Sequence, residues 1–161
     1  MSKSKKQFDR SAAFSLFELL IAIVIIATLA GIATLNFCGS IDYARLQNAT
    51  AKLTADLQLV RDQARRDQQP RTMTIDPDNL SYQATGVPSL DGPQDISVNL
   101  AEPPYQLSTL KFEPAGNYSI TFNARGLPAS TNSIITLCRG SKQTTIEIAQ
   151  GGSIEQINQA K

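Results

Sequence analysis

One carboxylate near the start of the chain, Glu18, stands at the leading edge of an apolar run and is the group best placed to do chemistry there. Residues 19–37 form a stretch of 19 consecutive residues without a charge. An acidic residue at the centre of a membrane-inserted helix costs about 2.5–3.5 kcal/mol, and less near its end, so a retained charge indicates a functional group with a partner. Cleavage between Ala13 and Phe14 would create an α-amino group one helical turn from Glu18. We therefore expect these two groups to pair, within one chain or between neighbouring chains.

An apolar helix must position these groups. At a rise of about 1.5 Å per residue, residues 14–37 cross roughly the 30 Å of a bilayer's hydrocarbon core. Four basic residues and one acidic residue precede the run, and a basic flank stays on the cytoplasmic side. Two alternatives remain open: a signal peptide cut after Ala33, which would leave Thr34 first, and a lipoprotein signal cut before Cys38.

Other reactive groups are few. The sequence has no histidine, which excludes a Ser-His-Asp triad and most zinc sites. Asp76, Asp78 and Asn79 offer oxygens that suit calcium, although three such residues around a proline are also typical of a plain turn. Cys38 and Cys138 lie in segments that we do not expect to bring their Cα atoms within the roughly 7 Å that a disulfide requires. We predict no enzyme, no cofactor and no metal.

A second helical pattern follows the apolar run. Its apolar residues recur at spacings of three and four, which predicts one buried helix face: Leu46, Ala49, Leu53, Leu57, Val60 and Ala64. Its charged residues are expected to fall mainly off that face: Arg45, Lys52, Asp56, Asp62, Arg65 and Asp67. Arg61, Arg65 and Arg66 are interpreted as a solvated face with local ion pairs. Together the two patterns predict one helix over residues 14–69, ended by Pro70.

From residue 70 onward the pattern changes to strands. Short alternating segments, divided by Pro, Gly and Asn turns, predict antiparallel strands packed as a sandwich or a rolled sheet. We expect them at residues 72–75, 80–83, 96–100, 106–112, 118–122, 134–138, 144–149 and 153–157, with a loop at 86–93. Beyond residue 69 there are six basic residues and eight acidic ones, so this half lacks the basic excess that phosphate binding requires.

The start of the chain resembles the processing site of type IV pilins and type II secretion pseudopilins. The resemblance rests on a basic leader, Ala13, Phe14 and a carboxylate, Glu18, as the fifth residue after the cut. It implies cleavage by a prepilin peptidase before Phe14, N-methylation of Phe14 and a role for Glu18 in assembly. The implied domains are a leader, 1–13, a long helix, 14–69, with its transmembrane part at 14–37, and a β domain, 70–161. The family usually has Gly where Ala13 stands.

The end of the chain resembles the GspH/FimT family of minor pseudopilins and minor pilins. Phe122 and Gly126 fit a Phe-x-x-x-Gly turn before two strands, and Gly151 fits the glycine that leads the last strand. The resemblance implies an α+β, pilin-like fold, in which the long N-terminal helix packs on the antiparallel β domain. It also implies a structural subunit of a type II secretion pseudopilus or a type IV pilus.

The implied partners are the prepilin peptidase, other pilin or pseudopilin subunits and an inner-membrane assembly platform. The implied location is the bacterial inner membrane, with a periplasmic C-terminal domain, before entry into a pilus or pseudopilus. Some pilin-side members bind DNA through arginines after the last glycine. Here Gly152, Ser153 and Ile154 stand there, so we expect no nucleic-acid partner. A secreted or lipid-anchored binding module and a DNA-uptake minor pilin are the alternative functions.

Overall fold

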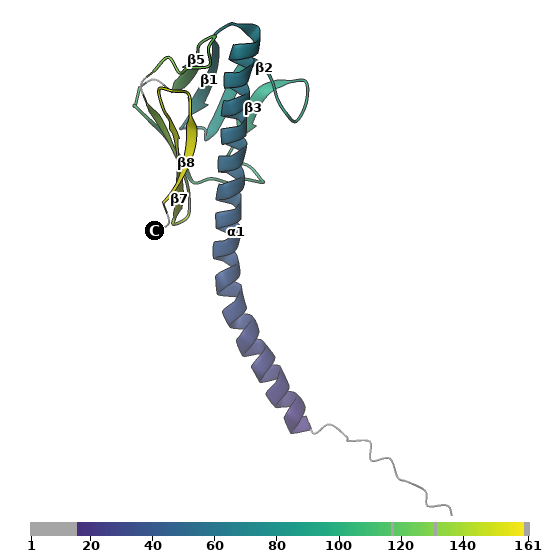
Figure 1. Ribbon diagram of the computed structural model, residues 1–161. Helices are drawn as coiled ribbons and strands as arrows, with labels where there is room; N and C mark the ends of the chain where they lie inside the picture. Colours follow the sequence, from purple (N-terminus) through teal and green to yellow (C-terminus); the bar gives the residue numbers. More distant parts are fainter. Residues whose placement is uncertain (1–15, 117, 131, 160–161) are drawn as a thin grey trace, which may run out of the picture. The chain divides into compact units, whose positions relative to one another are not determined.

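The computed structural model describes residues 16–116, 118–130 and 132–159, without the side chains of residues 32–38, 158 and 159. The chain divides into two compact units, Met1–Cys38 and Gly39–Lys161. One helix, α1, Leu16–Asp67, begins in the first unit and ends in the second (Figure 1). Among the described residues, no helix meets the combined requirement of length and apolarity for crossing a membrane.

The end of α1 lies at Asp67, two residues before the predicted boundary. Gln68 adopts a left-handed conformation with φ of 54°, and the amide of Gln69 donates to the carbonyl of Ala64 at 3.2 Å. This bond and the left-handed residue form a Schellman motif, which ends a helix by satisfying a terminal carbonyl. Pro70 follows and cannot extend the helical hydrogen bonding.

In the described residues, eight strands in two antiparallel sheets follow α1, which confirms the predicted fold class. The strands are β1 Arg71–Asp76, β2 Ser81–Pro88, β3 Asp95–Asn99, β4 Thr109–Glu113, β5 Ser119–Phe122, β6 Ser133–Arg139, β7 Lys142–Ile148 and β8 Ile154–Gln159. One sheet has the order β3-β2-β1-β5 and the other β4-β6-β7-β8. Within each sheet the inward side chains alternate with outward ones, as in β1, where Met73 and Ile75 are buried.

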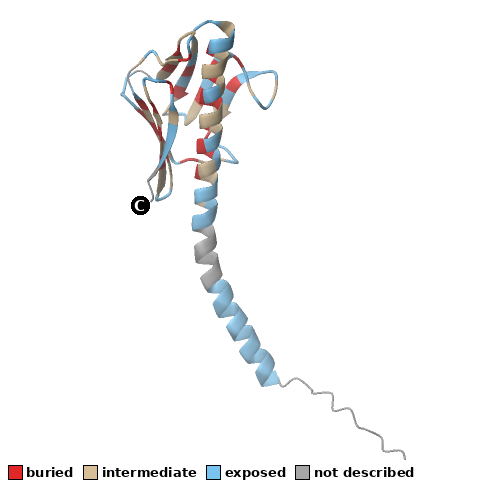
Figure 2. Cartoon of the chain, in the orientation of Figure 1, coloured by how far each residue is buried: buried red, intermediate tan, exposed pale blue. Residues whose placement is uncertain are grey.

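A single core joins the second half of α1 to both sheets. The predicted apolar face is confirmed, since each of its six residues is no more than 1% exposed. Figure 2 shows that buried positions in this unit occur both on α1 and on the strands. The helix face packs in one cluster with strand residues such as Ile75, Ile96, Phe122 and Ile146. Burial of such side chains is worth about 1.5–3 kcal/mol each, so this face anchors α1 to the sheets.

Strand β2 is longer than expected and continues into the predicted loop at residues 86–93. Its pairing with β3 shifts between Ala84, opposite Ile96, and Pro88, opposite Asp95. The intervening residues on β2 have no counterpart on β3, and Gly86 has a φ of 72°. An irregularity of this kind bends a strand and lets it continue past a glycine that would otherwise suggest a turn.

The turn between β1 and β2 uses the carboxylate of Asp76 as a cap. Its Oδ1 accepts from the amides of Asp78 at 3.1 Å and Asn79 at 3.0 Å, and its Oδ2 accepts from the side-chain amide of Asn79 at 2.7 Å. Among the described residues no group of acidic, cysteine or histidine side chains is arranged to hold a metal ion. The carboxylate therefore organises the turn that the sequence also suggested.

We predict that the Asp76 cap makes the free energy of unfolding depend on pH, with stability lost in acid. The hydrogen bonds from Asn79 lower the pKa of Asp76 below its ordinary value. A group with a lowered pKa stabilises the fold above its unfolded pKa, about 3.9 for Asp, and loses that contribution as pH falls through the folded value. Asp76→Ala should therefore be less stable than the wild type at pH 6, and the difference should shrink below pH 3.9 in urea unfolding measured at a series of pH values. Asp78→Ala is the control, because Asp78 donates its backbone amide to this turn and the substitution keeps that amide. An equal pH dependence in that variant would contradict the assignment.

Candidate functional site

The start of α1 carries the described part of the predicted processing and assembly site. Glu18 lies in the first turn of the helix, where the helix dipole favours a negative charge. Ala13 and Phe14 lie outside the described residues. The pairing of Glu18 with a new amino group thus remains a prediction.

Large apolar side chains surround Glu18 and continue along the helix without cover from the described part of the first unit. Their exposed fractions run from 43% at Ile21 to 83% at Leu16, and the other members are Phe17, Leu19, Leu20, Ile23, Val24, Ile25, Ile26 and Leu29. A helix that is apolar on all sides requires an apolar surrounding, which is lipid or a bundle of other helices. The described side chains of residues 16–31 therefore form an exposed, largely apolar surface.

The second unit holds the predicted family-motif residues in and beside one turn. Phe122 ends β5 with its side chain fully buried. The turn after it is built on Asn123, whose Oδ1 accepts from the amides of Arg125 at 2.9 Å and Leu127 at 3.1 Å. Gly126 takes a φ of 73° there and donates its amide to the carbonyl of Asn123 at 2.7 Å. The glycine is required because few other residues adopt this conformation without strain.

The turn before β8 contains two glycines, and Gly152 is the one that the backbone constrains. The family-motif role of Gly151 stays a prediction. Gly152 is buried and has a φ of 79°. A Cβ built on it would lie 2.8 Å from the carbonyl oxygen of Gly126, whereas a Cβ on Gly151 would meet no atom within 4 Å. The two turns, one on each side of β6 and β7, therefore touch through their backbones at Gly126 and Gly152.

Arginines from the last turns of α1 hold both turns. Arg65 donates from Nε to the carbonyl of Arg125 at 3.0 Å, and Arg61 donates from Nη1 to the carbonyl of Gly152 at 3.1 Å. Arg61 also pairs with Asp62 at 3.2 Å, as expected for local ion pairs. Arg65 and Arg66 are exposed, as expected for a solvated face. The bonds from Arg61 and Arg65 to the two loop carbonyls are contacts that the sequence did not indicate. We name Arg61, Arg65 and the two turns the arginine clamp.

We predict that Gly152→Ala lowers the free energy of unfolding by about 1–3 kcal/mol, the usual cost of a residue forced into a sparsely populated backbone conformation. The added methyl would also push against the Gly126 carbonyl and loosen the arginine clamp. Urea unfolding of the purified chain, followed by circular dichroism, measures the loss. Gly151→Ala is the matched control and should change stability by less than about 0.5 kcal/mol. Equal effects of the two substitutions would show that the contact at Gly152 is unimportant.

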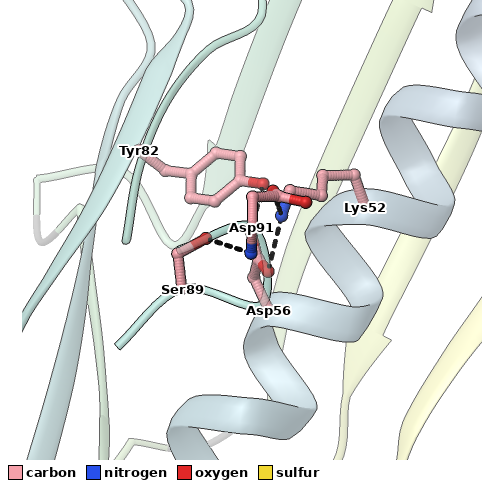
Figure 3. Close-up of polar contacts among 5 residues, drawn as sticks. All are labelled: Lys52, Asp56, Tyr82, Ser89 and Asp91. Carbon is pink, nitrogen blue, oxygen red and sulfur yellow. Dashed lines mark hydrogen bonds and ion pairs between the residues drawn. The ribbon is translucent and has the colours of Figure 1, made fainter. Parts of the chain in front are cut away.

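A buried polar cluster links the middle of α1 to the first sheet (Figure 3). Asp56 is 0% exposed. The hydroxyl of Tyr82 in β2 donates to its Oδ2 at 2.8 Å, and Lys52 approaches its Oδ1 at 3.3 Å. Lys52 also binds Asp91 at 2.5 Å, and the amide of Asp91 donates to the hydroxyl of Ser89 at 3.2 Å. The cluster thus ties the helix to β2 and to the loop between β2 and β3.

Burial and neighbouring charges shift the pKa values of Tyr82, Lys52 and Asp91 in this cluster. Burial, and next the charge of Asp56, raise the pKa of the Tyr82 hydroxyl, so it remains a donor. Burial alone would lower the pKa of Lys52, but its bond to Asp91 and the charge of Asp56 outweigh it and raise the pKa. The hydrogen bond from Lys52 lowers the pKa of Asp91. The contacts of Tyr82 with Asp56 and of Lys52 with Asp91 join α1 to β2 and to the loop after it, so the arrangement holds these segments together.

A second set of polar contacts fixes the part of α1 nearest Gly39. Arg139 at the end of β6 donates from Nε to Asp42 at 2.7 Å and from Nη1 to the carbonyl of Gln106. Arg45 donates to the side chain of the same Gln106. Gln106 has a φ of 51°, a conformation that costs roughly 1–3 kcal/mol in a residue other than glycine and persists where neighbours fix it. These contacts position the segment between β3 and β4 against the helix.

The expectation that Asp56 falls off the apolar face is wrong, and the sequence contained a signal for its burial. Asp56 follows Leu53 by three residues and precedes Val60 by four, so it lies on the same helix face as the apolar residues. A carboxylate on such a face is buried only with partners. Its partner, Tyr82, comes from a strand 26 residues later, and no local pattern identifies that pairing.

The comparisons with known proteins agree with this architecture. A family model described as type II transport protein GspH matches residues 49–152, and one described as prokaryotic N-terminal methylation motif matches residues 9–34. None of the curated proteins shows a significant match. Among solved structures, the chain is similar to the type IV minor pilin FimU of Pseudomonas aeruginosa strain PAO1, at 20% identity and a TM-score of 0.54 over 70% of this chain and 88% of FimU. It is also similar to the minor pseudopilin EpsH from the Type 2 Secretion System of Vibrio cholerae, at 17% identity and a TM-score of 0.53 over 71% of this chain and 97% of EpsH. At these identities the structural likeness concerns the fold.

Proposed function

The chain belongs to the type II transport protein GspH family, as a minor pilin-like subunit, and from that premise we propose how it is processed, anchored and assembled. A prepilin peptidase cuts between Ala13 and Phe14, and Phe14 is then N-methylated. The methylation motif over residues 9–34 supports this step, because it includes both residues.

The mature chain waits in the bacterial inner membrane, with residues 14–37 as its single membrane segment and the β domain in the periplasm. The unbroken uncharged run at residues 19–37 and the basic leader before it support this orientation. An assembly platform in the same membrane then transfers the subunit into a pseudopilus or a pilus.

Assembly works by exchanging one apolar surrounding for another. The apolar side chains of the first half of α1 leave lipid and pack against the corresponding helices of other subunits. The observation that carries the proposal is the exposure of these side chains in residues 16–29. Association of apolar helices is driven by packing and by polar groups that find partners. Glu18 supplies such a group, and the α-amino group at Phe14 of the same or a neighbouring chain neutralises it.

Mass spectrometry of the amino terminus of the chain purified from membranes tests the proposal. A mature chain that begins with N-methylated Phe14 supports a filament subunit. A chain that begins with Thr34 would instead be a secreted module, and a chain that begins with acylated Cys38 would be a lipoprotein. Either of the latter products lacks Glu18 and contradicts the proposed assembly.

A further inference from the structure

Within the described part of the chain, strand β3 leaves one edge of the first sheet without a further strand. It is the terminal strand in the order β3-β2-β1-β5. The amide of Leu100 donates to the carbonyl of Leu80, and Val98 and Ile96 continue this hydrogen-bonded series opposite β2. Because bonding alternates along an antiparallel strand, the amides and carbonyls of Ser97 and Asn99 point away from β2. These groups form a ready template for another strand.

Two of the common blocks to strand pairing, lysine and proline, are missing from β3, and the register shift of β2 lies at its Asp95 end. Proteins block sheet edges with lysine, proline, a bulge or a covering segment, and β3, with the sequence DISVN, has neither lysine nor proline. At the other end of the same sheet β5 is partly covered, since Ala129 donates to the carbonyl of Thr121 at 2.8 Å. In the second sheet the edge strand β4 carries Lys111.

The surroundings of β3 are acidic. Residues 72–110 contain five carboxylates and no basic residue. A hollow of about 400 Å³ lies beside the strand, and its lining includes Asp91, Asp95, Ser97 and Val98 but no lysine or arginine. Lys52, which reaches Asp91 from α1, is already shared between Asp91 and Asp56. The field at this edge therefore favours a cationic partner.

We propose that the open edge of β3 binds an extended, basic segment of another polypeptide chain, which adds to the first sheet as a further strand. The segment pairs its backbone with Ser97 and Asn99, in the manner of β-strand addition. On the outer face its lysine or arginine side chains lie beside Asp95, within reach of the hollow. On the inner face its alternate, apolar side chains continue the surface formed by Ile96 and Val98. This surface belongs to the second unit and is independent of the cleavage at Phe14.

The test uses the full chain in detergent micelles and two synthetic heptapeptides, one alternating valine with lysine and one alternating valine with glutamate. Amide exchange measured by NMR should slow at least tenfold at Ser97 and Asn99 with the lysine peptide, because their free amides gain partners. The amides of Ile96 and Val98, already bonded to β2, should keep their rates. The glutamate peptide should leave all four rates unchanged. Equal protection by both peptides, or by neither, would overturn the proposal.

Two variants separate the backbone and charge contributions. Ser97→Pro removes an outward amide without removing a bond to β2, a position at which an edge strand tolerates proline, and should abolish protection of Asn99 by the lysine peptide. Asp95→Lys should weaken binding of that peptide by about fivefold or more, as expected for a lost and reversed surface pair. Glu155→Lys makes the same charge reversal on β8, one of the two edge strands of the other sheet, and should have no effect. Similar losses in Asp95→Lys and Glu155→Lys, or concentration-dependent self-association through β3 without peptide, would contradict a specific basic partner.

Discussion

Replacement of Asp56 by alanine should lower the free energy of unfolding of the Gly39–Lys161 unit by about 3 kcal/mol, since removal of one partner from a buried polar pair costs about 3–5 kcal/mol. The substitution leaves the Tyr82 hydroxyl in the core without its acceptor at 2.8 Å. It also deprives Lys52 of one of its two carboxylates. Urea unfolding of the purified chain in detergent, followed by the β-sheet signal in circular dichroism, measures the change.

Two related variants show whether the cluster acts through hydrogen bonds. Asp56→Asn keeps an oxygen that can accept from Tyr82 and should cost less than Asp56→Ala. Tyr82→Phe removes one bond while the carboxylate keeps Lys52, and should cost about 1–2 kcal/mol. The double variant Asp56→Ala with Tyr82→Phe should lose less stability than the sum of the losses in these two single variants, because the two side chains share a hydrogen bond. An Asp56→Ala protein within 0.5 kcal/mol of the wild type would show that the cluster is not a structural tie.

Glu18→Ala should leave membrane insertion intact and reduce entry into the filament by at least about tenfold. Insertion is unaffected because the substitution makes the run more apolar. Assembly suffers because the proposed partner, the amino group of processed Phe14, would enter a dry helix bundle unpaired. An unpaired buried charge costs about 3–5 kcal/mol, and each 1.4 kcal/mol is a factor of ten. The measurement compares the amount of the subunit in sheared filaments with the amount in the membrane.

Glu18→Gln and Glu155→Ala complete this experiment. The glutamine variant keeps the size and polarity of the side chain without its charge, so it should fail as the alanine variant does. Glu155 is an exposed carboxylate of β8 in the other unit, and its removal should leave filament entry unchanged. Normal incorporation of Glu18→Ala would remove the basis for the pairing with Phe14.

The elements of this fold are predictable where a local pattern determines them. The apolar face of α1 shows in the spacing of Leu46 to Ala64, and all of its members are buried. The alternation in residues such as Met73 and Ile75 likewise identifies strands. The pairing order of the strands was not predictable. β1 lies between β2 and β5, and its pairing with β5 joins residues far apart in the sequence, such as Thr72 and Thr121.

The contacts that position the loops join residues that are far apart in the sequence, so they could not be predicted from the sequence. Gly152 resembles its neighbour Gly151 in the sequence, and only the approach of the Gly126 carbonyl distinguishes them. Arg61 and Arg65 looked like solvated helix residues, since nothing local indicates that two loop carbonyls lie within their reach. Long polar side chains choose among several partners, and the choice follows from the packed core rather than from spacing.

The polar contacts at both ends of the buried half of α1 have a mechanical consequence. At one end, Asp42 and Arg45 are hydrogen-bonded to β6 and to the segment between β3 and β4. At the other end, Arg61 and Arg65 are hydrogen-bonded to the turns before β8 and β6. A tensile force along this half of the helix would load both groups of bonds in shear at once. A slip of this half of the helix by one turn, about 5.4 Å, would break the contacts at both of its ends. A pulling force on it is therefore transmitted to β6 and to the turns before β6 and β8.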